Sequence, residues 1–182
     1  MIEGLCLFAS KGQFMPTAER YFTPTKILVP TDFSPSSATA LATATDLALL
    51  FHAEILLLHV IPILPAVTGV DLATPFFQTQ EFLLAAEKQA QEILTPSVFE
   101  LSGKGIEANI KVEVSNDVVG NVLSAVKKQE VDLLVISTHG MSGWRPIVFG
   151  SIAEKLIKLA ECPVLLLRST ATSFGDSGEV SK

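Results

Sequence analysis

The sequence predicts an α/β fold in which a single open parallel sheet carries helices on both faces, as in Rossmann-like proteins. Stretches with strand and helix patterns alternate along residues 26–168, and such alternation is typical of βαβ units. Two of the strand stretches, Glu54–Ile61 and Val131–Ser137, are almost uniformly apolar, as in strands buried on both faces. With 182 residues, 48% of them hydrophobic and 18% charged, the chain suits one packed domain.

The first strand and the first helix are predicted between residues 26 and 51. Lys26–Thr31 is short, apolar and partly β-branched, which favours a strand. Ser34 follows as a helix N-cap, and Pro35 stands at the first helical position, where its missing N–H is no loss. A stripe of alanine, leucine and threonine side chains then runs at helical spacing to about Phe51.

The second strand is predicted at Glu54–Ile61, and residues 62–79, which contain three prolines and a glycine, are predicted to be a long irregular connection. Helical spacing resumes near Gln80. Pro96 should end or kink this helix, because proline lacks an N–H and its ring clashes with the preceding turn.

The rest of the domain continues the same alternation. Asn116 or Asp117 is predicted to cap the third helix, which begins at about Val118 and carries Lys127 and Lys128 near its negative end. The remaining predicted elements are a turn at Ser102–Gly105 and strands at Ile106–Ser115, Val131–Ser137 and Pro163–Arg168, with a helix at Ser151–Glu161 before the last strand. Residues 1–22 are expected to be an N-terminal extension, 23–170 the domain, and 171–182 a flexible C-terminal tail.

Composition excludes several classes of function. The 13 basic residues are scattered among 19 acidic ones, for a net charge of −6, which argues against nucleic-acid binding. No apolar run approaches the roughly 20 residues that cross a bilayer. Cys6 and Cys162 form no metal-ligand or CxxC spacing, and two free thiols fit a reducing compartment. A signal peptide begins with positive charge, whereas this N-terminus carries the acidic Glu3. A cytoplasmic location is therefore expected.

Ligands of open parallel sheets bind beyond the carboxyl ends of the strands, and the loop 137–151 lies at such an end. It contains Gly140, Gly143 and Gly150, and Ser151 follows at the start of a helix. Glycines let backbone N–H groups approach an anion, and a helix N-terminus adds free donors. The pattern is that of a phosphate cradle, although a plain βα loop also uses glycines to turn. Neither a Walker-type loop nor GxGxxG occurs.

A second candidate is the turn that begins at Pro30 and Thr31. Asp32 lies at the end of the first strand, where a carboxylate can accept hydrogen bonds from ribose hydroxyls or from an adenine amine. The alternative is that Asp32 caps the following helix. His59, in the second strand, is predicted to be a core histidine with its hydrogen bonds satisfied.

Three segments, VPTDFSPSS, LLLHVIP and THGMSGWRPIVFGSIAEKLIKLAECPVLLL, resemble the universal stress protein family, and the resemblance covers about residues 24–168. The family's nucleotide motif is a glycine, two residues, a glycine, nine residues, a glycine, and a serine or threonine. Gly140, Gly150 and Ser151 match it, whereas Ser137 stands in the position of the first glycine.

The resemblance implies a five-stranded parallel sheet of order 3-2-1-4-5 that binds ATP between the ends of its first and fourth strands. AMP and ADP are alternatives, and Mg²⁺ or Mn²⁺ would be carried by the phosphates. It also implies a homodimer formed through the last strand, Val164–Leu167, and a protein partner that the sequence does not identify. The site residues follow by position: Asp32 would contact the ribose and base, Val60 would present main-chain groups to adenine, Ile136 and Ser137 would line the sugar, and Gly140, Gly150 and Ser151 would hold the phosphates.

His139, in the cradle loop, would either touch a phosphate or face solvent. The three histidines are too dispersed for a metal site. No Ser-His-Asp order, paired carboxylates or activated cysteine is present, and the cradle loop offers no evident base for phosphoryl transfer. Together with the resemblance, which implies an ATP-binding sensor or switch of the stress response, these absences argue against an efficient enzyme. Three alternatives stay open: a dimeric scaffold without nucleotide, which Ser137 favours, a slow ATPase, and an ATPase or adenylyl-transfer enzyme on the same fold.

Overall fold

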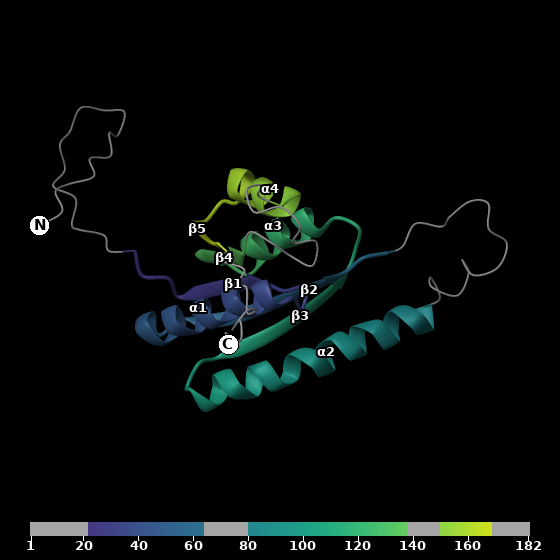
Figure 1. The fold of residues 1–182 in the computed structure, drawn as a ribbon, viewed down its shortest axis with the longest axis horizontal. Coiled ribbons are helices and arrows are strands. Elements are labelled where there is room, and N and C mark those ends of the chain that lie inside the picture. Colours follow the sequence, from purple (N-terminus) through teal and green to yellow (C-terminus); the bar gives the residue numbers. More distant parts are fainter. Residues whose placement is uncertain (1–21, 64–79, 138–149, 169–182) are drawn as a thin grey trace, which may run out of the picture.

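The computed structural model describes residues 22–63, 80–137 and 150–168, which contain alternating strands and helices (Figure 1). The predicted bounds agree with the observed ones to within two residues, except at the end of the second helix. The elements are β1 (Lys26–Pro30), α1 (Pro35–Phe51), β2 (Glu54–Ile61), α2 (Gln80–Gly103), β3 (Ala108–Val114), α3 (Val118–Lys128), β4 (Leu133–Ser137), α4 (Ser151–Leu159) and β5 (Val164–Leu167).

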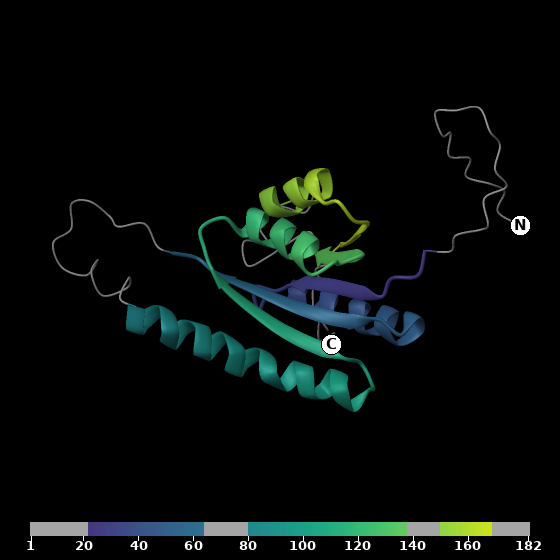
Figure 2. The ribbon, with the colours of Figure 1, turned by 180° about the vertical axis from the view of Figure 1, so that it is seen from behind.

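The five strands form one parallel sheet of order β3-β2-β1-β4-β5, which confirms the predicted fold and strand order. Figures 1 and 2 show α1 and α2 on one face of this sheet and α3 and α4 on the other. The strand order reverses between β1 and β4, which are neighbours in space although three helices and two strands separate them along the chain. In open α/β sheets this reversal point is where ligands bind.

The central strands are buried on both faces, as their uniform apolarity predicted. Along β1, Ile27 and Val29 belong to the core cluster that contains α1 and α2 side chains, whereas Leu28 belongs to the cluster that contains α3 and α4 side chains. Along β4, Leu134 and Ile136 likewise share the α3–α4 side. Since successive residues of a strand point to opposite faces, both faces of β1 and β4 must be apolar.

Pro96 was predicted to end or kink the second helix. The prediction of an end was wrong, because α2 continues through Pro96 to Gly103. Leu94 and Leu101, on either side of Pro96, are buried against the sheet in the core cluster of α1 and α2. This burial holds the helix together across the missing backbone hydrogen bond. The helix ends instead in a turn at which Gly105 has a φ of +81°, a conformation that glycine adopts without steric strain.

The predicted caps of two helices are confirmed. The Ser34 side chain accepts a hydrogen bond from the N–H of Ser37 at the start of α1. Of the two candidates for α3, Asp117 is the cap, and its Oδ1 atom accepts from the N–H of Gly120 at 2.8 Å. These side chains satisfy N–H groups that a helix leaves free in its first turn.

The predicted N-terminal extension 1–22 lies outside the described residues but for Phe22, and the predicted tail 171–182 lies wholly outside them. Within the described ranges, the helices are all too short or too polar to cross a membrane.

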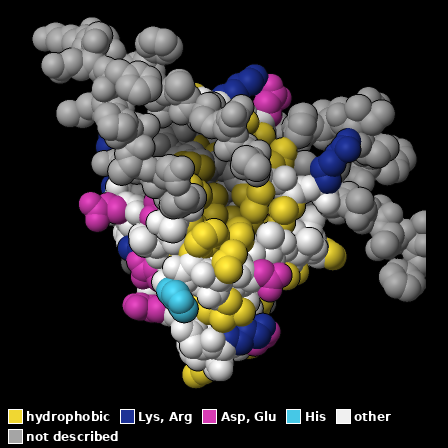
Figure 3. Space-filling view, turned by 90° about the vertical axis from the view of Figure 1, so that its left-hand side faces the viewer, with side chains coloured by type: hydrophobic (Ala, Val, Ile, Leu, Met, Phe, Trp, Pro, Cys, Tyr) yellow, Lys and Arg dark blue, Asp and Glu magenta, His cyan; other side chains and the backbone are white. Residues whose placement is uncertain are grey.

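Figure 3 shows the end of the molecule at which the strands begin. On the described part of this face acidic and basic side chains are interspersed around hydrophobic ones, without a basic patch.

Candidate functional site

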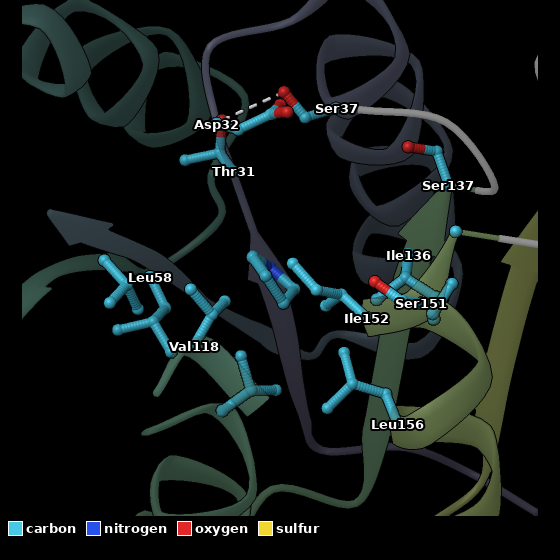
Figure 4. Close-up of a pocket in the computed structure, with 15 residues that line it drawn as sticks. Thr31, Asp32, Ser37, Leu58, Val118, Ile136, Ser137, Ser151, Ile152 and Leu156 are labelled. Atoms are coloured by element: carbon cyan, nitrogen blue, oxygen red, sulfur yellow. Dashed lines mark hydrogen bonds between the residues drawn. The ribbon is translucent and has the colours of Figure 1, made fainter. Parts of the chain in front are cut away.

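A pocket of about 380 Å³ lies at the carboxyl ends of β1 and β4, where the strand order reverses (Figure 4). Its volume is within the usual range of ligand sites. Predicted site residues from four elements and their adjoining loops line it: Pro30, Thr31, Asp32, Val60, Ile136, Ser137, Gly150 and Ser151. The remaining three predicted site residues, His139, Gly140 and Gly143, lie outside the described part of the chain.

The turn after β1 forms one polar end of the pocket. Thr31 is fixed by its backbone N–H, which donates to the carbonyl oxygen of Leu58 on β2 at 2.8 Å. Its hydroxyl lies 3.1 Å from that of Ser37, in the first turn of α1. Figure 4 shows Thr31, Asp32 and Ser37 together at this end. The hydroxyl and carboxylate oxygens can therefore serve as hydrogen-bonding groups for a polar ligand.

Asp32 does not cap α1, which is the role that the alternative interpretation gave it. Ser34 is the cap, and the Asp32 Oδ1 atom accepts a hydrogen bond from the backbone N–H of Ser34 at 3.1 Å. The carboxylate thus makes a hydrogen bond to Ser34 within its own turn, and Asp32 also lines the pocket. Asp32 is the ionisable residue among the described residues of the lining, so it introduces a negative charge there.

The second strand approaches the pocket through Leu58 and Val60. His59, between them, directs its Nδ1 atom to the carbonyl oxygen of Thr31 at 2.8 Å. Its ring also lies against the ring of Phe33, with the centroids 4.2 Å apart. The predicted hydrogen bond of His59 is therefore confirmed at Nδ1, and its partner is the turn that carries Asp32. The prediction of a core histidine was wrong, because the strand ends at the pocket there and leaves His59 only half-buried.

The opposite side of the pocket is formed by the end of β4 and the start of α4. Figure 4 shows Ile136 and Ser137 on the strand and Ser151 on the helix along this side. Gly150 is the N-cap of α4 and has no side chain with which to cap the first turn. The N–H groups that begin a helix carry the positive end of its dipole, so an anion in the pocket can interact with them favourably.

The rest of the pocket wall is apolar. It includes Val118 and Val122 from α3 and Ile152, Ala153 and Leu156 from α4, none of which was predicted. The signal was present in the sequence, because these residues occupy the first two turns of helices that follow strand ends. Ile152 is 45% exposed and lines the pocket rather than the core. An apolar wall facing a polar rim can hold a flat ring with a polar substituent.

The described lining contains no lysine or arginine. Likewise, no group of three His, Cys, Asp or Glu side chains in the described part of the chain is arranged to hold a metal ion. A second hollow, of about 560 Å³, lies at the other end of the sheet, where it is lined by residues such as Thr25, His52 and Lys104. Its Lys104 is paired with Glu100 at 2.6 Å, and the hollow is remote from the strand ends where ligands of such sheets bind.

The comparisons with known proteins all indicate the same family. The model of the universal stress protein family matches residues 24–168. Universal stress protein YxiE of Bacillus subtilis is 30% identical over 147 residues, which cover 79% of this chain and 98% of that protein. Universal stress protein MJ0531 of Methanocaldococcus jannaschii is 33% identical over 150 residues, which cover 79% of this chain and 81% of that protein.

Solved structures share the fold. Universal stress protein UspA of Lactobacillus plantarum superposes with a TM-score of 0.63 at 24% identity, covering 79% of this chain and 97% of that one. A universal stress protein from Archaeoglobus fulgidus in complex with dAMP gives a TM-score of 0.54 at 20% identity, covering 80% and 98%. A universal stress protein in complex with cAMP gives 0.55 at 18% identity, also covering 80% and 98%.

Proposed function

Because the chain belongs to the universal stress protein family, we propose that it binds an adenine nucleotide in the pocket at the ends of β1 and β4. The main support is that every predicted site residue that the structure describes lines this one pocket. Two proteins of the same fold were solved with dAMP and with cAMP. We further propose that the ligand is ATP, with AMP and ADP as weaker alternatives, and that binding switches the interaction with a protein partner in the stress response.

The division of the pocket supports a nucleoside. The apolar side chains of Leu58, Val118 and Leu156 provide a wall against which a base can lie, since burying a flat apolar ring is favourable. Asp32 and the hydroxyls of Thr31 and Ser137 provide polar partners at the rim. A ribose offers hydroxyl donors that a carboxylate accepts well.

The phosphates would lie at the start of α4. Gly150 and Ser151 bring backbone N–H groups and a hydroxyl to that point, and a helix N-terminus attracts anions. Since no lysine or arginine occurs in the described lining, a divalent cation such as Mg²⁺ or Mn²⁺ carried by the phosphates would neutralise part of their charge.

A binding switch fits these residues better than an enzyme does. Efficient phosphoryl transfer needs a positioned nucleophile and several positive charges near the leaving group. Among the described lining residues the ionisable group is Asp32, which lies at the opposite side of the pocket from Ser151. We therefore propose no efficient catalysis. A cytoplasmic location accords with the two cysteines, which have no CxxC or metal-ligand spacing.

The proposal is tested by mass spectrometry of nucleotide released from the purified protein, followed by calorimetric titration with ATP, AMP and cAMP in the presence of Mg²⁺. Gly150→Val should abolish binding, because its side chain would occupy the space of a phosphate at the start of α4. Gly103→Val is the matched control. A Cβ at Gly103 would meet no atom within 4 Å, and this glycine lies at the end of α2, away from the pocket. It should bind as the parent does.

Ser137 separates this function from that of a scaffold without nucleotide. A serine adds a Cβ and a hydroxyl where the family motif has a glycine, and one hydrogen bond is worth about 0.5–1.5 kcal/mol net. We expect Ser137→Gly to change the affinity for ATP by roughly tenfold or less. Binding by Ser137→Gly but not by the parent would identify the natural protein as a scaffold.

A further inference from the structure

Phe33, the residue after Asp32, has an unusual conformation. Its φ is +63°, in the left-handed region where a side chain other than that of glycine is sterically strained. Its side chain is also 40% exposed, so burial compensates for only part of that strain. The ring of Phe33 contacts the ring of His59 on β2, with the centroids 4.2 Å apart and the planes inclined by 32°. The contact with the His59 ring is an interaction that can offset the backbone strain at Phe33.

His59 makes a second contact with the same turn. Its Nδ1 atom lies 2.8 Å from the carbonyl oxygen of Thr31. Because a carbonyl oxygen only accepts hydrogen bonds, Nδ1 carries the proton and donates. His59 therefore contacts the residues immediately before and after Asp32: the backbone of Thr31 through a hydrogen bond and the ring of Phe33 through stacking.

Within the turn, further hydrogen bonds connect these contacts to Asp32. The backbone N–H of Phe33 donates to the hydroxyl of Thr31 at 3.1 Å, and that of Ser34 donates to the Asp32 carboxylate at 3.1 Å. The direction of the Asp32 side chain thus depends on the backbone conformation on both sides of it. That conformation is strained at Phe33 and needs an external support.

We propose that His59 and Phe33 are positioning residues that hold the Thr31–Ser34 turn so that Asp32 faces the nucleotide. Neither residue lines the pocket among those described, so both would act through Asp32. This proposal rests on the proposed function for its ligand, although the conformation of the turn can be measured without one.

The first experiment measures amide hydrogen exchange in the nucleotide-free protein. In His59→Leu, which removes the donor to Thr31, the amides of Phe33 and Ser34 should exchange about tenfold faster or more, because local opening of the turn is easier. His59→Gln, whose side-chain amide can donate in place of Nδ1, should restore part of the protection. The amide of Gly120, which donates a comparable hydrogen bond to the Asp117 side chain, serves as an internal reference that should not change.

The second experiment separates positioning from stability. Phe33→Gly removes the ring but also the strain at φ +63°, so it should not lower the midpoint of thermal unfolding. Its affinity for ATP should nevertheless fall by about tenfold, the ratio that corresponds to one lost hydrogen bond to a ligand. His52→Gly is the matched control, because His52 has a φ of +57° at the far end of α1. It relieves the same kind of strain and should bind ATP as the parent does.

Parent-like exchange of Phe33 and Ser34 in His59→Leu would overturn the proposal, as would a parent-like affinity in Phe33→Gly. Should His59→Leu not fold, the surface variant Phe33→Gly decides by both measurements, since its amides at positions 33 and 34 should also exchange faster. A parent protein that binds no nucleotide overturns the proposed function instead. The exchange rates then decide by themselves whether His59 and Phe33 hold the turn.

Discussion

The hydroxyl of Thr25 donates to the Oδ2 atom of Asp132 at 2.8 Å, although the two residues are 107 positions apart in the chain. The same carboxylate accepts the backbone N–H of Thr25 at 2.9 Å and that of Lys26 at 3.1 Å. Thr25 directly precedes β1, and Asp132 directly precedes β4. One side chain therefore joins the starts of the two strands whose opposite ends form the pocket.

Asp132→Ala should lower the free energy of unfolding by about 2 kcal/mol, because it removes three hydrogen bonds to a charged group that are partly open to solvent. Urea unfolding followed by circular dichroism measures the change. Thr25→Val removes only the hydroxyl bond and should cost less. Equal losses in the two variants would show that the backbone bonds to Asp132 contribute nothing.

The cap of α3 and Gly120 should be coupled. A Cβ at Gly120 would come 2.2 Å from the Oδ2 atom of Asp117, whose Oδ1 atom caps the helix. Gly120→Ala would gain helix propensity of about 0.5–1 kcal/mol but displace a cap worth about 1 kcal/mol. We expect it to be near neutral in the parent and stabilising in Asp117→Ala. A double-mutant cycle of denaturant unfolding measures this, and additive effects would contradict the coupling.

Pro96→Ala should stabilise the protein by about 2 kcal/mol. A proline inside a helix costs about 3 kcal/mol relative to alanine, and part of the gain is offset because alanine makes the unfolded chain more flexible. Pro35→Ala is the control, since proline at the first position of α1 sacrifices no helical hydrogen bond. Thermal unfolding compares the two variants. A loss of stability in Pro96→Ala would mean that the proline ring makes a packing contribution of its own.

The chain is expected to form a homodimer through β5, which ends the strand order and pairs with β4 in the described sheet. Light scattering should give twice the 19.5 kDa of the chain. Leu134 donates to the carbonyl of Pro163, so by the alternation of a parallel ladder the N–H of Leu166 points away from β4.

Leu166→Pro should therefore abolish dimerisation while the β4–β5 hydrogen bonds remain, because proline removes a donor that faces outwards. On the other edge of the sheet, the N–H of Val112 also points outwards by the same alternation. Val112→Pro is the matched control and should stay dimeric. A parent protein that is monomeric at all concentrations would refute the homodimer.

The Cys162 thiol should react slowly. Its burial raises its pKa above the ordinary value, so at pH 8 less of it is the reactive thiolate than in the unfolded chain. In a Cys6→Ser variant, iodoacetamide should modify Cys162 more slowly in buffer than in urea at the same pH. Because the unfolded chain loses this proton first, stability should fall as the pH rises from the pKa of the unfolded thiol through the higher pKa of the folded one. A Cys162→Ala variant should lack that part of the pH dependence.

The helix caps and one side of the site could be predicted because they are local in the chain. Ser34 and Asp117 act as caps through neighbours three residues away, and such contacts follow from residue type and spacing alone. Gly150 and Ser151 could be placed at a helix start for the same reason. The contact between Phe33 and His59 could not be predicted, because it depends on which side chains of adjacent strands and turns meet.

The sequence by itself determined the alternation of strands and helices, the burial of the central strands on both faces and the strand ends at which a ligand site should lie. These follow from periodicity and from composition, which are properties of short segments. Only the tertiary structure decided that α2 continues through Pro96, that Val118 and Leu156 form the apolar wall of the pocket, and that His59 supports the turn of Asp32. Each of these depends on the packing of segments distant in the chain, where burial and long-range hydrogen bonds outweigh local propensity.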